Sequence, residues 1–153
     1  MMDLVRIEDP AYISDFCNSD SHLLAYSLYA HYKPKIPNCE LITCRDNDHY
    51  HTFVHISTDD GERFLDAHGI HDSLEDVVNH FKLDHHSNNE ETSIEVIEPD
   101  NNSLHLCIKS SDRYQQYIEP LDAAGRDTYF SELIQSLALH YIWRVQPYLL
   151  KPF

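Results

Sequence analysis

Residues 50–67 read YHTFVHISTDDGERFLDA, and this stretch carries the strongest structural signal in the chain. Its first part, from Tyr50 to Ser57, alternates apolar and polar side chains with the period of two that is typical of a half-buried strand. Residues 59–61 form a turn sequence, and Arg63 to Ala67 can return as a second strand. The stretch therefore predicts a β-hairpin.

A helix is expected before the hairpin. Asp20 or Ser21 can cap it, because a side-chain oxygen at that position satisfies free N–H groups of the first turn. An apolar stripe at i, i+4 spacing continues to about Tyr32, and Pro34 and Pro37 then stop the helix.

The rest of the chain completes a two-layer arrangement. Further strands are expected at Glu40–Cys44, Ser93–Ile97 and Leu104–Lys109. Ser73, with Asp76 three residues later, begins a short helix, and an aromatic-rich helix is expected at about residues 127–144. This order predicts an α+β fold, with the N-terminal helix packed on an antiparallel sheet and the C-terminal helix covering it.

Length and composition restrict the class of protein. The 153 residues predict a single domain, residues 1–153, with a catalytic-like core at about residues 12–110. Apolar residues make up 42% of the chain, which provides a hydrophobic core and excludes intrinsic disorder. Eleven basic and 26 acidic residues give a net charge of −15, so we expect repulsion from phosphate backbones and no direct nucleic-acid partner.

The chain shows no targeting or cofactor signal. It contains neither an apolar run long enough for a membrane span nor a secretory signal pattern at its N-terminus. Four cysteines without CxxC spacing (Cys17, Cys39, Cys44 and Cys107) indicate reduced thiols. We therefore expect a cytoplasmic protein, or an effector exported without a cleaved signal. Only three glycines are present, so no phosphate-cradling loop is available and no cofactor is expected.

The hairpin offers a candidate catalytic pair. His51 lies on its first strand and Asp66 on its second, where side chains on one face can lie about 5 Å apart. An aspartate beside a histidine fixes its tautomer and stabilises its protonated form. The N-terminus of the first helix is the natural place for a nucleophile, because free N–H groups and the helix dipole stabilise an anion there.

Residues 17–70 carry a family pattern. Ala25 and Leu28 lie on the first helix, HTFV occupies residues 51–54, and Asp66, followed by Ala67, comes fifteen residues after His51. This pattern resembles the transglutaminase-like and papain-like cysteine enzymes. Those enzymes carry a cysteine at the start of a buried helix, followed by a small residue four positions on and an apolar residue seven positions on.

The helix half of the pattern departs from the family. Counting back four residues from Ala25, or seven from Leu28, gives Ser21 where the family has its cysteine. Ser21 can stand in for the cysteine in a pseudoenzyme or a Cys-to-Ser inactive form, or it can itself be the nucleophile, activated by His51. Alternatively, the helix begins earlier and Cys17 is the nucleophile.

The resemblance implies chemistry on a protein or peptide-like amide. The nucleophile would attack the amide carbonyl, His51 would transfer the proton and Asp66 would orient His51. Water would then give hydrolysis or deamidation, and an amine would give transamidation. If the chain is not catalytic, His51 and Asp66 are an ordinary cross-strand pair. Ser21 is then a helix cap, and Cys17 is a small buried hydrophobic residue.

Two other functions fit the composition. The acidic charge is compatible with a non-catalytic binding or inhibitor protein, either immunity-like or a nucleic-acid mimic. The twelve histidines also allow a zinc-binding protein, because His49, His51 and His55 have the same strand parity and His68 and His71 lie nearby in the sequence.

Overall fold

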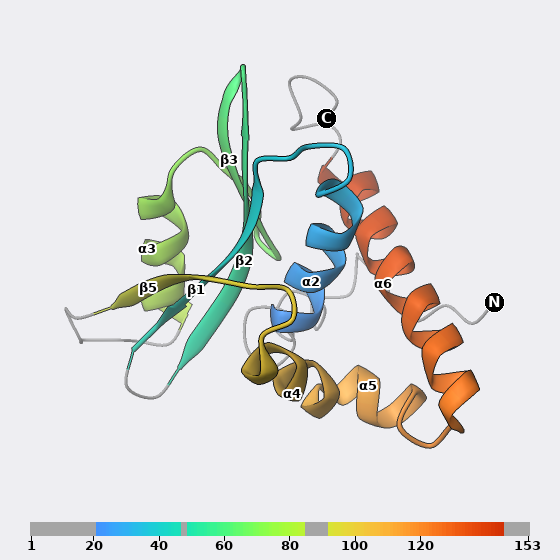
Figure 1. Cartoon of the computed structure of the whole chain (residues 1–153). Coiled ribbons are helices and arrows are strands. Elements are labelled where there is room, and N and C mark those ends of the chain that lie inside the picture. The colour runs from blue at the N-terminus through green and yellow to red at the C-terminus, as the bar shows by residue number, and fades with distance from the viewer. Residues whose placement is uncertain (1–20, 47–48, 85–91, 146–153) are drawn as a thin grey trace.

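The computed structural model describes residues 21–46, 49–84 and 92–145 (Figure 1). The elements within these ranges are α2 (Ser21–Tyr32), β1 (Cys39–Arg45), β2 (Tyr50–Thr58), β3 (Gly61–Asp66), β4 (Gly69–His71), α3 (Leu74–Asp84), β5 (Ser93–Ile97), α4 (Asn102–Ser110), α5 (Asp112–Tyr117) and α6 (Ala123–Val145).

The expected hairpin is confirmed and forms the centre of the sheet. The strand order is β4-β3-β2-β1-β5, with every neighbouring pair antiparallel. Strands β2 and β3 pair from Thr58↔Gly61 to Val54↔Leu65, and residues 59–60 form the two-residue turn. Gly61 has a φ of 120°, a conformation that is open to glycine but strained for other residues.

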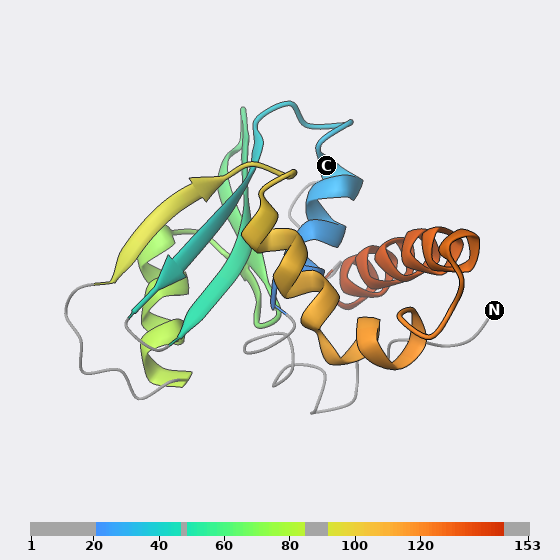
Figure 2. The same ribbon diagram turned by 60° about the horizontal axis from the view of Figure 1, so that its bottom comes forward.

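Side-chain alternation along β2 builds a core on each face of the sheet. Val54 and Ile56 point to one face and pack with α2, whereas Phe53 points to the other and packs with Val77 and Phe81 of α3. All five side chains are nearly or fully buried. Figures 1 and 2 show the resulting layers, with α3 on one side of the sheet, α2 on the other, and α6 packed on the far side of α2.

The α+β prediction is confirmed in part, because the C-terminal helix packs mainly on α2 and does not cover the sheet as expected. The N-terminal helix packs on a five-stranded antiparallel sheet, and the long C-terminal helix contacts that helix. The cap expected at Ser73 is also present, because its Oγ accepts the N–H of Asp76 at 3.2 Å. Tyr141 ties α6 to the sheet, since its hydroxyl donates to the carbonyl of Gly69 at 2.8 Å.

The strand predicted at Leu104–Lys109 is wrong, because this segment lies within helix α4. Asn101 caps α4, and its Oδ1 accepts the N–H of Leu104 at 3.0 Å. Leu104 and Ile108, one helical turn apart, are buried, whereas Leu106 between them is 65% exposed. The alternation of apolar residues suggested a period of two, but only the i, i+4 pair faces the core.

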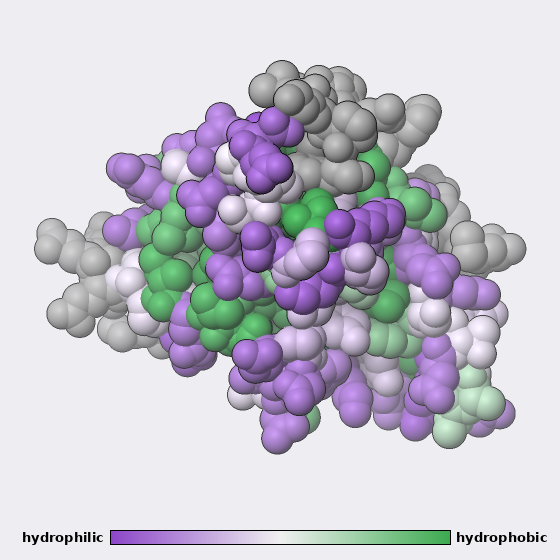
Figure 3. Space-filling model, turned by 45° about the horizontal axis from the view of Figure 1, so that its top comes forward, coloured by the Kyte–Doolittle hydropathy of each residue, from purple (hydrophilic) through white to green (hydrophobic). Residues whose placement is uncertain are grey.

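The face shown in Figure 3 is mostly hydrophilic, with hydrophobic patches between the polar side chains. The large apolar side chains exposed in the described ranges are Tyr50, Leu83, Ile94, Val96, Leu106 and Leu139. Within those ranges, no helix combines the length and the apolar character that a membrane span requires.

Candidate active site

The first turn of α2 meets the sheet at the point where β3 has ended. The pairing of β2 with β3 stops at Val54↔Leu65, so the backbone of Thr52 has no strand partner on that side. The N–H of Thr52 instead donates to the Oγ of Ser21 at 3.3 Å. Ser21 is only 1% exposed. Position 21 is therefore held against the strand that carries His51, directly beside the next residue of that strand.

The hairpin brings His51 and Asp66 into contact. The Nε2 of His51, on β2, lies 3.0 Å from the Oδ2 of Asp66, the last residue of β3. Both side chains are almost completely buried. The proximity expected from the hairpin is observed, and its use in catalysis stays a prediction.

A second imidazole shares the same carboxylate. The Oδ1 of Asp66 lies 2.8 Å from the Nε2 of His71 and also accepts the backbone N–H of His68 at 3.0 Å. Burial alone would raise the pKa of Asp66, but the hydrogen bonds from His51 and His71 outweigh burial and hold the pKa well below its usual range. The carboxylate is thus ionised and accepts, so both imidazoles donate from Nε2.

The other ring nitrogen of His51, Nδ1, is buried. Its Nδ1 has no hydrogen-bond partner among the described residues. The ring is fixed by stacking, with centroids 5.8 Å from Phe53 and 6.4 Å from Phe81. A histidine held at Nε2 by a carboxylate keeps a lone pair on Nδ1, which is the arrangement that a general base needs.

The structure does not complete a triad within the described residues. No hydrogen bond joins Ser21 to His51 there, and the two residues connect only through the backbone of Thr52. Cys17, the alternative nucleophile, lies outside the described residues. The site as described is a His–Asp–His cluster with a serine hydroxyl beside it.

The histidines proposed as zinc ligands do not meet as one group, because His51 and His71 contact Asp66 whereas His49 and His55 have other partners. His55 is bound on both ring nitrogens, with its Nδ1 2.8 Å from Glu40 and its Nε2 3.0 Å from Glu62. His49 lies before β2 and pairs with Asp46. Across the described ranges, no group of three or more His, Cys, Asp or Glu side chains is arranged to hold a metal ion. The geometry gives the zinc hypothesis no support.

Sequence reasoning missed two histidines of this region. His71 was considered only as a zinc ligand, because its strand, β4, is three residues long and leaves no alternation to detect. His22 received no role, although it follows Ser21 and is 6% exposed. Burial and the charges of His51 and Arg45 lower the pKa of His22 to about 4. The signal in the sequence that could have pointed to His22 was its position next to Ser21, the expected nucleophile.

The fold and the site together describe an α+β protein with a buried His–Asp–His cluster beside the first turn of its N-terminal helix. No protein-family model matches the chain. No curated protein and no solved structure matches it either.

The His71–Asp66 contact makes stability depend on pH. Burial lowers the pKa of His71, but the hydrogen bond and charge of Asp66 more than compensate, so the pKa of His71 is raised above 6.5. A raised histidine pKa contributes stability that is complete below the unfolded value and lost as pH rises through the folded value. We therefore expect the free energy of unfolding, measured with urea, to fall as pH rises above about 6.5.

The variant His71→Gln should reduce this fall, because glutamine does not titrate. His31→Gln, on the other side of the sheet at the end of α2, is the matched control and should retain it. An equal fall in the unaltered chain and in His71→Gln would show that another group is responsible.

Proposed function

We propose that this chain has a papain/transglutaminase-like architecture whose site is built for amide hydrolysis, deamidation or acyl transfer on a protein or peptide-like amide. Ser21 occupies the nucleophile position. Because a serine hydroxyl stands where such sites use a thiolate, the chain as written is a form with little or no activity.

One observation carries the proposal. Position 21, at the start of α2, accepts a hydrogen bond from the strand residue that follows His51, and His51 in turn donates to a buried carboxylate. A contact of 3.3 Å thus joins the start of the helix to the strand residue after His51, and a contact of 3.0 Å joins the imidazole to the carboxylate. A structural ion pair alone gives no reason for the orphaned, buried Nδ1 of His51.

The proposed mechanism follows from these roles. The atom at position 21 attacks the amide carbonyl carbon and gives its proton to Nδ1 of His51. His51 then delivers that proton to the leaving amine as the carbon–nitrogen bond breaks, which leaves an acyl group on position 21. Water or a second amine releases the acyl group by the reverse proton transfers. Asp66 holds the imidazole and stabilises its positive charge throughout.

The serine explains the expected loss of activity. A thiolate at position 21 would receive the Thr52 N–H and could persist as an ion pair with His51. A hydroxyl must lose its proton during the attack, and no hydrogen bond to His51 prepares it for that loss. The same site therefore activates a thiol far better than an alcohol.

Introducing a thiol at position 21 tests the proposal. Ser21→Cys, mixed with the activated ester p-nitrophenyl acetate, should release a burst of nitrophenolate and gain one acetyl group at position 21. The double variant Ser21→Cys with His51→Ala should react about 100-fold more slowly, because a positioned general base contributes about 10²–10⁴-fold. The unaltered chain should show no burst.

Peptide mapping by mass spectrometry locates the acetyl group. Acetylation of Ser21→Cys that is equally fast without His51 would refute the proposal. Acetylation of Cys17 that depends on His51 would move the nucleophile one helical turn earlier.

A further inference from the structure

Strand β5 forms one edge of the sheet. It ends the strand order and, in the described part of the chain, pairs with β1 alone. Figure 2 shows β5 in yellow at the margin of the sheet, and four of its five side chains are exposed. The outer side of an edge strand carries backbone N–H and C=O groups that no neighbouring strand uses, so an edge strand can accept a further strand.

The register of the sheet identifies the open backbone groups of β5. The N–H of Ser57 donates to the carbonyl of Asn38 at 2.9 Å, where β1 begins to pair with β2. Because the backbone groups of successive residues point to opposite sides of a strand, the residues of β1 at odd numbers from Asn38 point to β5. Their partners are Ser93, Glu95 and Ile97. The N–H and C=O groups of Ile94 and Val96 therefore point away from the sheet.

The side chains of Ile94 and Val96 extend the core that lies between the sheet and α3. They are paired with Cys44 and Ile42, and residues directly opposite one another share a face of the sheet. Cys44 and Ile42 are buried in one core cluster with Phe81 of α3. By contrast, Ile94 is 43% exposed and Val96 is 58% exposed. A strand added at this edge would thus bury apolar surface as well as pair the open backbone groups.

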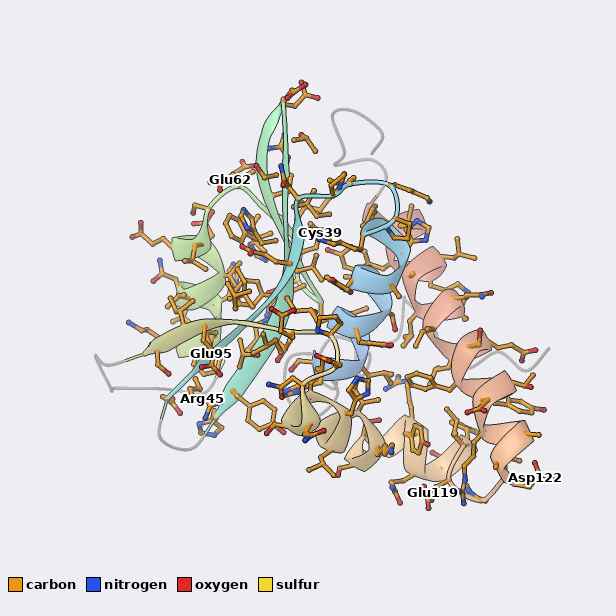
Figure 4. All side chains as sticks on the ribbon, in the orientation of Figure 1. Cys39, Arg45, Glu62, Glu95, Glu119 and Asp122 are labelled. Atoms are coloured by element: carbon orange, nitrogen blue, oxygen red, sulfur yellow. The ribbon has the colours of Figure 1, made fainter. Side chains whose placement is uncertain are left out.

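The charges around this edge are mostly acidic. Glu95 lies on the opposite face of β5 from Val96, beside Arg45 of β1, with which it forms an ion pair of 3.5 Å (Figure 4). Just after the strand, Glu98 and Asp100 are exposed and have no basic partner among the described residues. A basic segment is therefore attracted to this edge, and an acidic segment is repelled.

A second copy of the chain fits this edge poorly. In an antiparallel pair of β5 strands with Ile94 opposite the Val96 of the second copy, the two Glu95 side chains would lie directly opposite each other. Like charges at such positions destabilise a sheet. Both copies would also carry the net charge of −15.

We propose that the open edge of β5 binds an extended segment of another protein, in which apolar residues alternate with lysine or arginine. The segment adds a strand to the sheet, with its apolar side chains beside Ile94 and Val96 and its basic side chains beside Glu95. Strand β1 separates this edge from β2, which carries His51. The interaction needs no reaction at position 21, so it does not depend on the proposed catalytic function.

Three peptides of equal length test the proposal by NMR titration of the unaltered, ¹⁵N-labelled chain at pH 7. The first, acetyl-Lys-Val-Lys-Val-Lys-amide, should shift the backbone amides of β5 saturably. Its counterpart with glutamate in place of each lysine should bind at least about tenfold more weakly, because like charges then meet. The lysine peptide with both valine nitrogens methylated keeps its charge and loses two backbone donors, so it should also bind at least about tenfold more weakly.

Hydrogen exchange tests the direction of the backbone groups. In the free chain, the amides of Ile94 and Val96 should exchange at least about tenfold faster than the amide of Glu95, which bonds to β1. The lysine peptide should slow the exchange of Ile94 and Val96. Equal exchange of all three amides, with or without the peptide, would contradict the proposal.

Val96→Pro removes one outward N–H and keeps the bonds to β1, a change that edge strands tolerate. Val96→Thr is the matched control, because it keeps the N–H and a branched side chain. Val96→Pro should bind the lysine peptide at least about tenfold more weakly than Val96→Thr.

The proposal is overturned if the lysine peptide fails to saturate, if either modified peptide binds as tightly, or if the two Val96 variants bind equally. Should Val96→Pro not fold, the methylated peptide decides alone. Sedimentation of the unaltered chain should show a monomer. A dimer that Val96→Thr retains and Val96→Pro dissociates would assign the edge to a second copy instead.

Discussion

Ser21→Cys is expected to carry the most reactive thiol in the chain. The Thr52 N–H and the start of α2 both favour a thiolate at position 21, and the His51–Asp66 pair supplies a counter-charge. At pH 6, lowering a thiol pKa from about 8.5 to about 6 raises the thiolate fraction about 100-fold. The accompanying loss of nucleophilicity costs about tenfold. Iodoacetamide should therefore alkylate position 21 about tenfold faster than a simple exposed thiol.

The chain's own cysteines provide internal references. Burial raises the pKa of Cys39 to about 11 and that of Cys44 to about 12, so neither should react at pH 6. Adding His51→Ala to Ser21→Cys should return the rate to that of an ordinary thiol, and peptide mapping assigns each label. Equal rates with and without His51 would exclude an ion pair between position 21 and the imidazole. Fast, His51-dependent labelling of Cys17 in the unaltered chain would instead favour the earlier nucleophile.

Asp66→Ala is expected to produce the largest loss of stability. Asp66 is 2% exposed and is the acceptor for two buried imidazoles, so its removal leaves both donors without their partner. Breaking a buried charged pair by removing one member costs about 3–5 kcal/mol. Urea unfolding at pH 6 should show this loss. Asp72→Ala, which removes an exposed carboxylate from the same region, should change stability by no more than about 0.5 kcal/mol.

The pH dependence of this loss of stability distinguishes the contribution of the Asp66 charge from that of its side-chain packing. A depressed carboxyl pKa contributes stability that is present above the unfolded value and lost as pH falls through the folded value. The difference in the free energy of unfolding between the unaltered chain and Asp66→Ala should therefore become smaller below about pH 4. A gap that stays constant down to pH 2 would mean that the loss comes from the cavity left by the side chain.

The parts of the fold that follow from local sequence were predictable. The alternation of residues 50–57, the turn at residues 59–60 and the capping residue Ser73 each determine their element without distant contacts. The same reasoning gives the wrong element for Leu104 to Lys109. Apolar and polar residues alternate there, although a capping asparagine precedes the segment. There the cap and the burial of one i, i+4 pair outweigh the alternation.

The proximity of His51 and Asp66 was predictable from the sequence, whereas the surrounding contacts were not. The hairpin placed His51 beside Asp66, and Ser21 was selected only through the resemblance to the cysteine enzymes. The shared carboxylate was not predictable, because His71 reaches Asp66 through a three-residue strand. The contact between Ser21 and Thr52 depends on where β3 ends relative to β2, which is a tertiary property with no signature in either strand.

The nitrogen resonances of His51 test the central claim most directly. In ¹⁵N-labelled Ser21→Cys at pH 7, long-range ¹H–¹⁵N NMR should show His51 protonated on both nitrogens, as the partner of a thiolate. Alkylation of position 21 with iodoacetamide should return the ring to the neutral form with its proton on Nε2, facing Asp66. A neutral His51 with the same spectrum before and after alkylation would contradict the account, because position 21 and the imidazole would then not act on one another.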